Sequence, residues 1–200
     1  TLTFVEPKSR AFGALGHAIT DADTGTVLTV SEGAVYESRV VDVLPGASGE
    51  PGELLGEFFN EALRLGRVTG NNGYGLYGIM DGETQSLLYP DGVPLRTRSE
   101  VKTGPATILT TLDGGGVKEY DCEITRLYPQ DAPSQRGLAV RITDPDLLRR
   151  TSGIVQGMSG SPILQNGGMV GAITHVFIND PTQGYGMYIE WMLEQADAAA

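Results

Sequence analysis

Residues 153–163 read GIVQGMSGSPI, a glycine-rich turn with two serines between short apolar runs. Such a turn either reverses the chain or presents a serine side chain beside backbone N–H groups. Gly157 and Gly160 lack a Cβ, so the backbone on both sides of Ser159 can turn sharply. The N–H groups of Gly157 and Ser159 could then bind an oxyanion, while Pro162 stiffens the exit from the turn. The stretch therefore makes Ser159 a candidate nucleophile.

The composition limits the kinds of partner and chemistry. The chain has 200 residues, 28 of them glycine, and 25 acidic against 14 basic residues give a net charge of −11. This acidity disfavours nucleic acid and anionic membrane surfaces as partners. No apolar run approaches the roughly 18 residues of a membrane span, so we expect no direct membrane insertion by this domain. Two histidines and one cysteine, without ligand-like spacing, predict neither a metal nor a cofactor.

Short strand-like runs separated by turn residues recur along the chain. They include TVLTV (26–30), AVYESRVVDVL (34–44) and a hairpin pattern over 106–127 that turns around Asp113–Gly116. Such spacing is typical of a β-barrel or sandwich. GYGLYG (73–78) matches a dinucleotide-binding pattern in letters, but IMDGET follows it where that motif needs a helix, so we assign it to a β-strand.

Helical patterns are few. Residues 51–66 have apolar residues at helical spacing, although Gly56 also allows a strand–turn–strand. DPDLLRRTSG (144–153) predicts one helical turn capped by Asp144 and stopped by Gly153, and residues 189–200 predict a closing helix that buries Trp191 or Met192. We predict a single all-β domain with minor helix over residues 1–200, formed by two β subdomains that divide near 95–105.

The order of the chemical groups favours one catalytic scheme. An unactivated serine needs a neutral imidazole as its base, and that imidazole needs an acceptor that fixes its tautomer. The nucleophile-elbow scheme fails here, because Ser161 stands where its final glycine should be and no acid-then-histidine order follows. The order histidine, acid, serine fits His17, Asp144 and Ser159. Asp23 stays an alternative acid because it lies nearer to His17 in sequence.

The serine motif also resembles a known signature. GMSGSP (157–162) is similar to the GDSGGP motif of chymotrypsin-like serine peptidases, which places the nucleophile at Ser159. Met158 replaces the aspartate that, in many of those enzymes, binds a newly formed N-terminus during activation. The resemblance thus implies that this activation switch is absent.

Longer stretches resemble the SpoIVB peptidase family. They are FGALGHAITDADTG (12–25), SGEPGELLG (48–56) and the run from 142 to 193. The resemblance implies a chymotrypsin-like double β-barrel with the active site in the cleft between the barrels. The family's catalytic residues fall on His17, Asp144 and Ser159, and His175 is expected to line the substrate-binding cleft. Ala18 departs from the glycine that usually follows the histidine.

The resemblance also implies a biological role. Members are serine endopeptidases that cut a membrane-anchored inhibitory regulator of an intramembrane protease, which leads to activation of a late sporulation sigma factor, and they process themselves. The expected location is the space between the two forespore membranes, after export. Because the sequence begins at Thr1, we expect an excised domain whose N-terminal anchor lies outside it. The alternative is a catalytically inert or latent β-barrel module that grips a partner segment.

Overall fold

The N-terminal half of the molecule is an open β-sheet with a separate hairpin. The computed structural model describes residues 1–58, 63–83, 86 and 88–199. Five strands form one sheet in the order β1-β2-β7-β6-β3, and β4 pairs only with β5. The strands are β1 (Leu2–Val5), β2 (Ala11–Ala14), β3 (Ala34–Tyr36), β4 (Ser38–Leu44), β5 (Glu53–Phe58), β6 (Arg64–Asn72) and β7 (Gly75–Met80).

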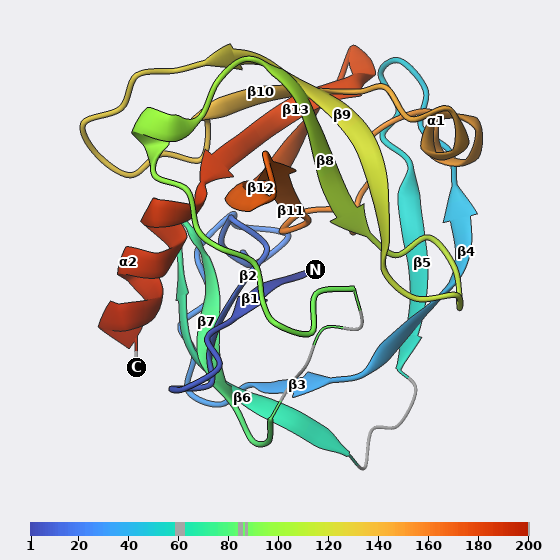
Figure 1. Ribbon diagram of the computed structural model, residues 1–200. Coiled ribbons are helices and arrows are strands. Elements are labelled where there is room, and N and C mark those ends of the chain that lie inside the picture. The colour runs from blue at the N-terminus through green and yellow to red at the C-terminus, as the bar shows by residue number, and fades with distance from the viewer. Residues whose placement is uncertain (59–62, 84–85, 87, 200) are drawn as a thin grey trace.

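The C-terminal half is a closed six-stranded barrel. Its order around the barrel is β10-β13-β12-β11-β8-β9 (Figure 1). The strands are β8 (Gly104–Thr110), β9 (Lys118–Leu127), β10 (Leu138–Ile142), β11 (Pro162–Gln165), β12 (Gly168–Phe177) and β13 (Asp180–Tyr188). The predicted hairpin over 106–127 is confirmed, because β8 and β9 pair antiparallel from Gly104–Ile124 to Thr110–Lys118.

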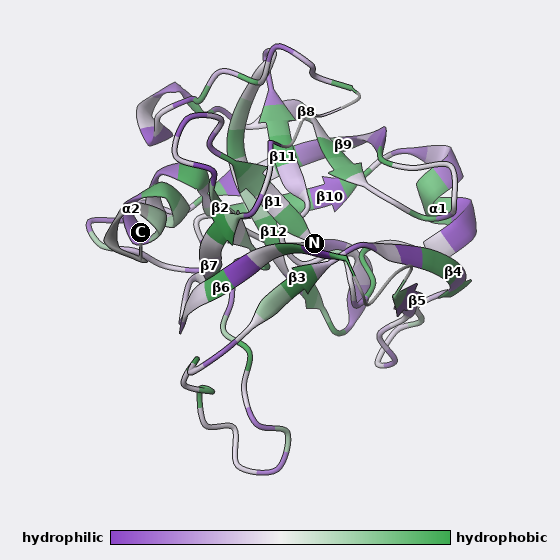
Figure 2. Ribbon diagram, turned by 90° about the horizontal axis from the view of Figure 1, so that it is seen from below, coloured by the Kyte–Doolittle hydropathy of each residue, from purple (hydrophilic) through white to green (hydrophobic). Residues whose placement is uncertain are grey.

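The barrel holds most of the hydrophobic core. Alternating residues of its strands point inward, as the period of two in a β-strand requires. The hydropathy colouring places hydrophobic residues on the barrel strands β8 and β9 (Figure 2). The core side chains that are wholly removed from solvent include Ile108, Ile124, Leu138, Ile163, Ile173 and Met187.

Both predicted short helices are confirmed. Helix α1 (Pro145–Thr151) begins at the N-cap Asp144 and ends at Ser152, whose φ of 62° is left-handed. Helix α2 (Ile189–Ala199) buries Trp191 and Met192 and packs against strands of both halves, namely β2 and β7 of the sheet and β12 and β13 of the barrel. A short 3-10 turn, η1 (Arg98–Glu100), precedes β8. No helix of the described chain is long and apolar enough to cross a membrane.

The structure departs from the sequence-based predictions in three places. Of the two interpretations of residues 51–66, the helix is wrong and the two strands are found: β5 and the start of β6 lie there, while residues 59–62 are outside the described residues. The predicted strand at 26–30 is reduced to one bridge between Thr20 and Val27. The mostly β class with minor helix is confirmed, but in the described chain only the C-terminal half closes into a barrel.

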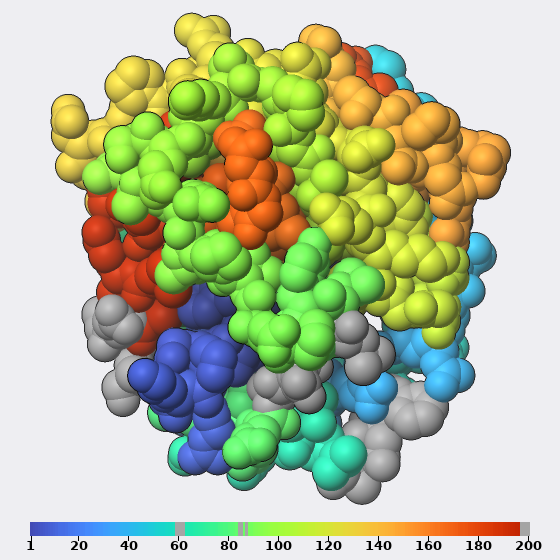
Figure 3. Space-filling view, viewed as in Figure 1, coloured from blue at the N-terminus to red at the C-terminus, as the bar shows by residue number. Residues whose placement is uncertain are grey.

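The chain between β7 and β8 joins the two halves. In the space-filling view this green segment crosses the visible face between the blue N-terminal residues and the orange turn between β11 and β12 (Figure 3). It is held there by backbone hydrogen bonds, from Arg96 N to Met169 O at 2.9 Å and from Met169 N to Pro94 O at 2.8 Å. These bonds fix the connecting segment to strand β12 of the barrel.

The GYGLYG stretch forms the turn into β7 and the strand itself, as predicted. A Cβ on Gly78 would lie 2.0 Å from the carbonyl oxygen of Arg67 and 2.7 Å from the Phe12 ring. Gly78 therefore serves close packing inside the sheet rather than a phosphate contact.

We expect Gly78→Ala to destabilise the protein by about 1–3 kcal/mol or more, because the added methyl group overpacks β7. Gly56→Ala is the matched control, since the nearest atom to its Cβ, the Arg39 carbonyl oxygen, lies at 3.6 Å. Urea unfolding of both variants measures the difference. Equal stability of the two variants would contradict the close packing at Gly78.

Candidate active site

The turn that carries Ser159 is fixed to strand β12. Gly160 N donates to Ile173 O at 2.7 Å, and Ile173 N donates to Ser161 O at 2.9 Å. Ser161 is completely buried, and its hydroxyl has no hydrogen-bond partner within the described residues, whereas Ser159 is half-buried. Of the two serines, only Ser159 can therefore be reached from outside.

Two amides of this turn are available to a ligand. Met158 N donates to Val155 O, and Gly160 N and Ser161 N also have backbone acceptors. By contrast, the N–H groups of Gly157 and Ser159 donate to no acceptor in the part of the chain that the structure describes. Gly157 has φ of 96°, a conformation that favours glycine. The two amides predicted to form the oxyanion hole are thus unpaired, as that role requires.

The segment before His17 packs directly on the serine turn. Leu15 and Gly16 both have positive φ values, 69° and 73°, which turn the chain sharply after β2. A Cβ on Gly160 would lie 2.5 Å from Leu15 N, and one on Gly16 would lie 2.9 Å from Cγ2 of Thr174. These contacts bring the histidine segment, from the N-terminal half, next to Ser159 of the C-terminal half.

The imidazole of His17 has a backbone acceptor. Its Nδ1 lies 2.9 Å from the carbonyl oxygen of Ala18. Because a carbonyl oxygen can only accept, Nδ1 carries the proton of this hydrogen bond, and Nε2 of the neutral ring keeps its lone pair. This is the tautomer that a general base for serine needs.

The Ser159 hydroxyl donates its hydrogen bond to the backbone of β12 and not to His17. Its Oγ donates to the carbonyl oxygen of Thr174 at 3.1 Å. Among the described residues, no hydrogen bond joins it to His17. Thr174 is almost completely buried and lies where the register between β12 and β13 shifts, so that Ile173 faces Gly186 and His175 faces Tyr185.

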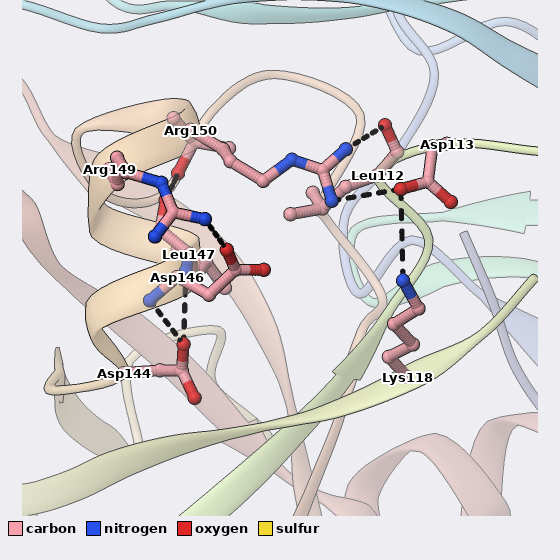
Figure 4. Close-up of polar contacts among 9 residues, drawn as sticks. Leu112, Asp113, Lys118, Asp144, Asp146, Leu147, Arg149 and Arg150 are labelled. Carbon is pink, nitrogen blue, oxygen red and sulfur yellow. Dashed lines mark hydrogen bonds and ion pairs between the residues drawn. The ribbon is translucent and has the colours of Figure 1, made fainter. Parts of the chain in front are cut away.

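Asp144 is used as a helix cap. Its Oδ1 accepts from Asp146 N at 2.8 Å and Leu147 N at 3.0 Å (Figure 4). Its Oδ2 accepts from Asp121 N at 3.4 Å. The carboxylate thus accepts hydrogen bonds from amides at the start of α1, which have no acceptor within the helix. It makes no hydrogen bond to His17, so this geometry does not support the predicted role of Asp144 in orienting the base.

The alternative acid, Asp23, is also separate from the imidazole. It is exposed in a turn that Asp21 organises by accepting from Thr24 N at 2.8 Å. The described residues show no hydrogen bond from the Asp23 carboxylate to His17. The acceptor that orients His17 in this structure is therefore the Ala18 carbonyl group rather than either candidate acid.

His175 lies beside the predicted base. Its ring centre is 5.6 Å from that of His17, and its side chain is exposed on β12. The pKa of His175 is lowered. The largest cause is partial burial of the ring, and repulsion from positive charge on His17 and Arg136 adds to it. The expected place of His175 on the wall of a substrate-binding cleft stays a prediction. No group of three or more His, Cys, Asp or Glu residues within the described ranges is arranged to hold a metal ion.

The comparison with protein families is decisive. The model of the SpoIVB peptidase family S55 matches residues 1–193. The chain belongs to the SpoIVB peptidase family. It is therefore a serine peptidase.

Similarity to individual proteins is more distant. No curated protein matches. The active form of the Rv3671c protease from M. tuberculosis is 14% identical, with 96% of this chain and 81% of that chain covered and a TM-score of 0.47. The inactive form of the Rv3671c protease is 15% identical, with 70% of each chain covered and a TM-score of 0.45.

In this SpoIVB-family peptidase, strand β1 and the residue before it also form hydrogen bonds to the serine turn. Thr3 is buried, and its hydroxyl donates to Gly160 O at 2.8 Å; the Thr1 hydroxyl donates to Gly157 O at 2.9 Å. These threonines and Thr174 are not predicted from the sequence, because a hydroxyl group has no sequence pattern of its own. A signal did exist for Thr174, which lies in a glycine-rich strand directly before His175.

We expect Asp144→Asn to label with a fluorophosphonate probe at the wild-type rate, because asparagine caps a helix about as well as aspartate. Asp144→Ala should lose about 1 kcal/mol of stability through the lost cap and also keep the wild-type rate. The measurements are the labelling rate and urea unfolding. A loss of labelling on the order of 10⁴-fold in Asp144→Asn, with unchanged stability, would instead identify Asp144 as the catalytic acid.

Proposed function

We propose that Ser159 attacks the substrate peptide carbonyl and that His17 acts as the general base and then the general acid. The Gly157 and Ser159 amides would stabilise the oxyanion, and the Ala18 carbonyl group would orient His17. The observation that carries this proposal is the pair of unpaired amides beside the only accessible serine of the turn. Preorganised donors of this kind are worth most when they are directed at the charge that develops in the transition state.

The reaction begins with a change at the nucleophile. The Ser159 hydroxyl must leave the Thr174 carbonyl oxygen and turn toward Nε2 of His17. His17 then takes the hydroxyl proton as Oγ bonds to the carbonyl carbon and the carbonyl π electrons move onto the oxygen. When the C=O bond re-forms, the C–N bond breaks and the imidazolium gives its proton to the leaving amine. Water, deprotonated by His17, then hydrolyses the acyl-enzyme, and the proton returns to Ser159 Oγ. The Nδ1–H bond to the Ala18 carbonyl oxygen keeps the ring orientation throughout these steps.

A latent form of the same enzyme is the second candidate. The hydrogen bond from Ser159 to Thr174 is the observation that favours it, since a serine held this way is not activated by an imidazole. Binding of a substrate or partner that itself donates to the Thr174 carbonyl group would release Ser159. This candidate shares its catalytic residues with the first and differs only in its resting state.

We also propose the finer biological role that membership of the SpoIVB peptidase family suggests. The enzyme would act in the space between the two forespore membranes, after export, and cut a membrane-anchored inhibitor of an intramembrane protease. The cut would allow activation of a late sporulation sigma factor, and the enzyme would also process itself. The match of the family model over residues 1–193 supports this role.

The assignment of the nucleophile is tested by fluorophosphonate labelling. We expect wild type and Ser161→Ala to label and Ser159→Ala not to label, because Ser161 is buried. Ser161→Ala should also be no less stable than wild type, since the hydroxyl it removes is buried without a partner. His17→Ala should label about 100-fold more slowly or worse. Labelling that persists in Ser159→Ala would disprove the assignment.

The biological role is tested in an endospore-forming bacterium that lacks its own family member. We expect the wild-type domain, fused to that member's anchor, to restore a reporter that depends on the late sigma factor. Ser159→Ala should not restore it. A reporter restored equally by Ser159→Ala would show that the role needs no proteolysis, and the absence of rescue by an active wild-type enzyme would contradict the proposed substrate.

A further inference from the structure

A hollow beside the proposed catalytic residues lies between the two halves of the molecule. It has a volume of about 430 Å³ and is lined by Gly73, Tyr74, Ser134, Gln135 and Arg136. The first two belong to the turn between β6 and β7, and the other three to the loop between β9 and β10. The Gln135 side-chain amide donates to the Gly73 carbonyl oxygen and so joins these two segments.

One residue connects this hollow to the nucleophile. The Thr174 hydroxyl lies 2.8 Å from Gln135 O, and the Thr174 carbonyl oxygen accepts from Ser159 Oγ. A substrate segment bound at Ser159 would therefore pass close to the wall that Gln135 and Arg136 form. A side chain of that segment can extend into the hollow.

Arg136 lies on the aromatic surface that continues from the site. His175 is directly opposite Tyr185 in the pairing of β12 and β13, so both side chains lie on the same face. The Arg136 guanidinium is 5.0 Å from the centre of the Tyr185 ring. Phe177 and Tyr128 also contact this ring, with centre-to-centre distances of 4.6 Å and 6.1 Å. Stacking on a ring positions a guanidinium while its N–H edge remains free to donate.

Two arginines stack on the tyrosines of this surface although the chain is strongly acidic. Arg136 and Arg126, whose guanidinium lies 4.9 Å from the Tyr128 ring centre, are exposed, and neither forms an ion pair among the described residues. The neighbouring charges that act on His175 are those of His17 and Arg136, both positive. Both therefore differ in sign from the net charge of −11 of the whole chain.

We propose that Arg136 forms a specificity site for an acidic side chain, aspartate or glutamate, close to the scissile bond of the substrate. The planar guanidinium matches a carboxylate through two parallel N–H···O bonds, which an apolar or basic side chain cannot replace. The proposal rests on the proposed function, because it assumes that the segment bound here is a substrate of Ser159. It makes Arg136 a determinant of specificity and not a catalytic residue.

The first experiment profiles cleavage. A mixture of sequenced peptides with blocked ends, so that only side chains carry charge, is digested at low ionic strength, and the cut sites are identified by mass spectrometry. We expect acidic residues to be enriched about two- to fivefold near the cut bonds, the effect of one partly exposed ion pair. Arg136→Gln should abolish the enrichment, and Arg136→Glu should replace it with an enrichment of basic residues.

A matched control separates the local contact from overall charge. Arg149→Gln makes the same change in net charge on α1, where Arg149 pairs with Asp146, and it should keep the acidic preference. Thermal unfolding should show all three variants folded. A preference that survives in Arg136→Gln, or that is absent in wild type, would overturn the proposal.

A binding measurement keeps the proposal separate from the catalytic assignment. Blocked fluorescent peptides that differ only by glutamate or glutamine are titrated with Ser159→Ala, and with Ser159→Ala carrying Arg136→Gln. Tighter binding of the glutamate peptide only when Arg136 is present supports the specificity site, even if wild type is not labelled by fluorophosphonate. Equal binding of both peptides refutes it, even if labelling at Ser159 succeeds.

Discussion

The close packing of Gly160 against the backbone of Leu15 holds the histidine segment and the serine turn together. A side chain at Gly160 would occupy the position of Leu15 N and of Thr1 O, each only 2.5 Å from a Cβ placed there. A Cβ placed on Gly16 would likewise lie 2.9 Å from Cγ2 of Thr174. Because the two halves of the molecule supply the two segments, these contacts decide whether a base and a nucleophile can meet at all.

Thr174 is the residue on which the surrounding elements converge. Its carbonyl oxygen holds the Ser159 hydroxyl, its own hydroxyl lies within hydrogen-bond distance of Gln135 O and Tyr185 O, and its methyl group touches the position of Gly16. The nucleophile, the base segment and the proposed specificity loop thus share one buried side chain. If one of these segments moves, Thr174 moves with it and changes the contacts of the other two. Substrate binding can release Ser159 by this route.

Local patterns predicted much of the fold because they reflect contacts within short segments. The cap and stop signals of 144–153 gave α1 correctly, and turn residues located the β8–β9 hairpin. The helical interpretation of 51–66 failed because β5 pairs with β4 and also bonds to a segment distant in sequence: Leu54 N donates to Gln156 O, and Gln156 N donates to Gly52 O. These bonds to the serine turn impose an extended backbone on residues that have helical spacing.

The candidate site was harder to predict in detail. The Gly157 and Ser159 amides follow from local turn chemistry, and the structure leaves both without an acceptor in the described chain. Residue order suggested Asp144 as the partner of His17, yet the helix cap, which the sequence also indicated, holds that carboxylate. The acceptor found at Nδ1 is a backbone carbonyl group, and since every residue has one, sequence gives no sign of it.

The central claim is that Ser159, His17 and the two free amides act on one carbonyl group, and a crystal structure of a covalent phosphonate adduct tests it most directly. The account predicts a bond to Ser159 Oγ, with one phosphonyl oxygen about 2.7–3.1 Å from both Gly157 N and Ser159 N. It also predicts that His17 Nδ1 still donates to the Ala18 carbonyl oxygen while Nε2 faces Oγ. A phosphonyl oxygen away from both amides, or a carboxylate bound at Nδ1, would contradict it.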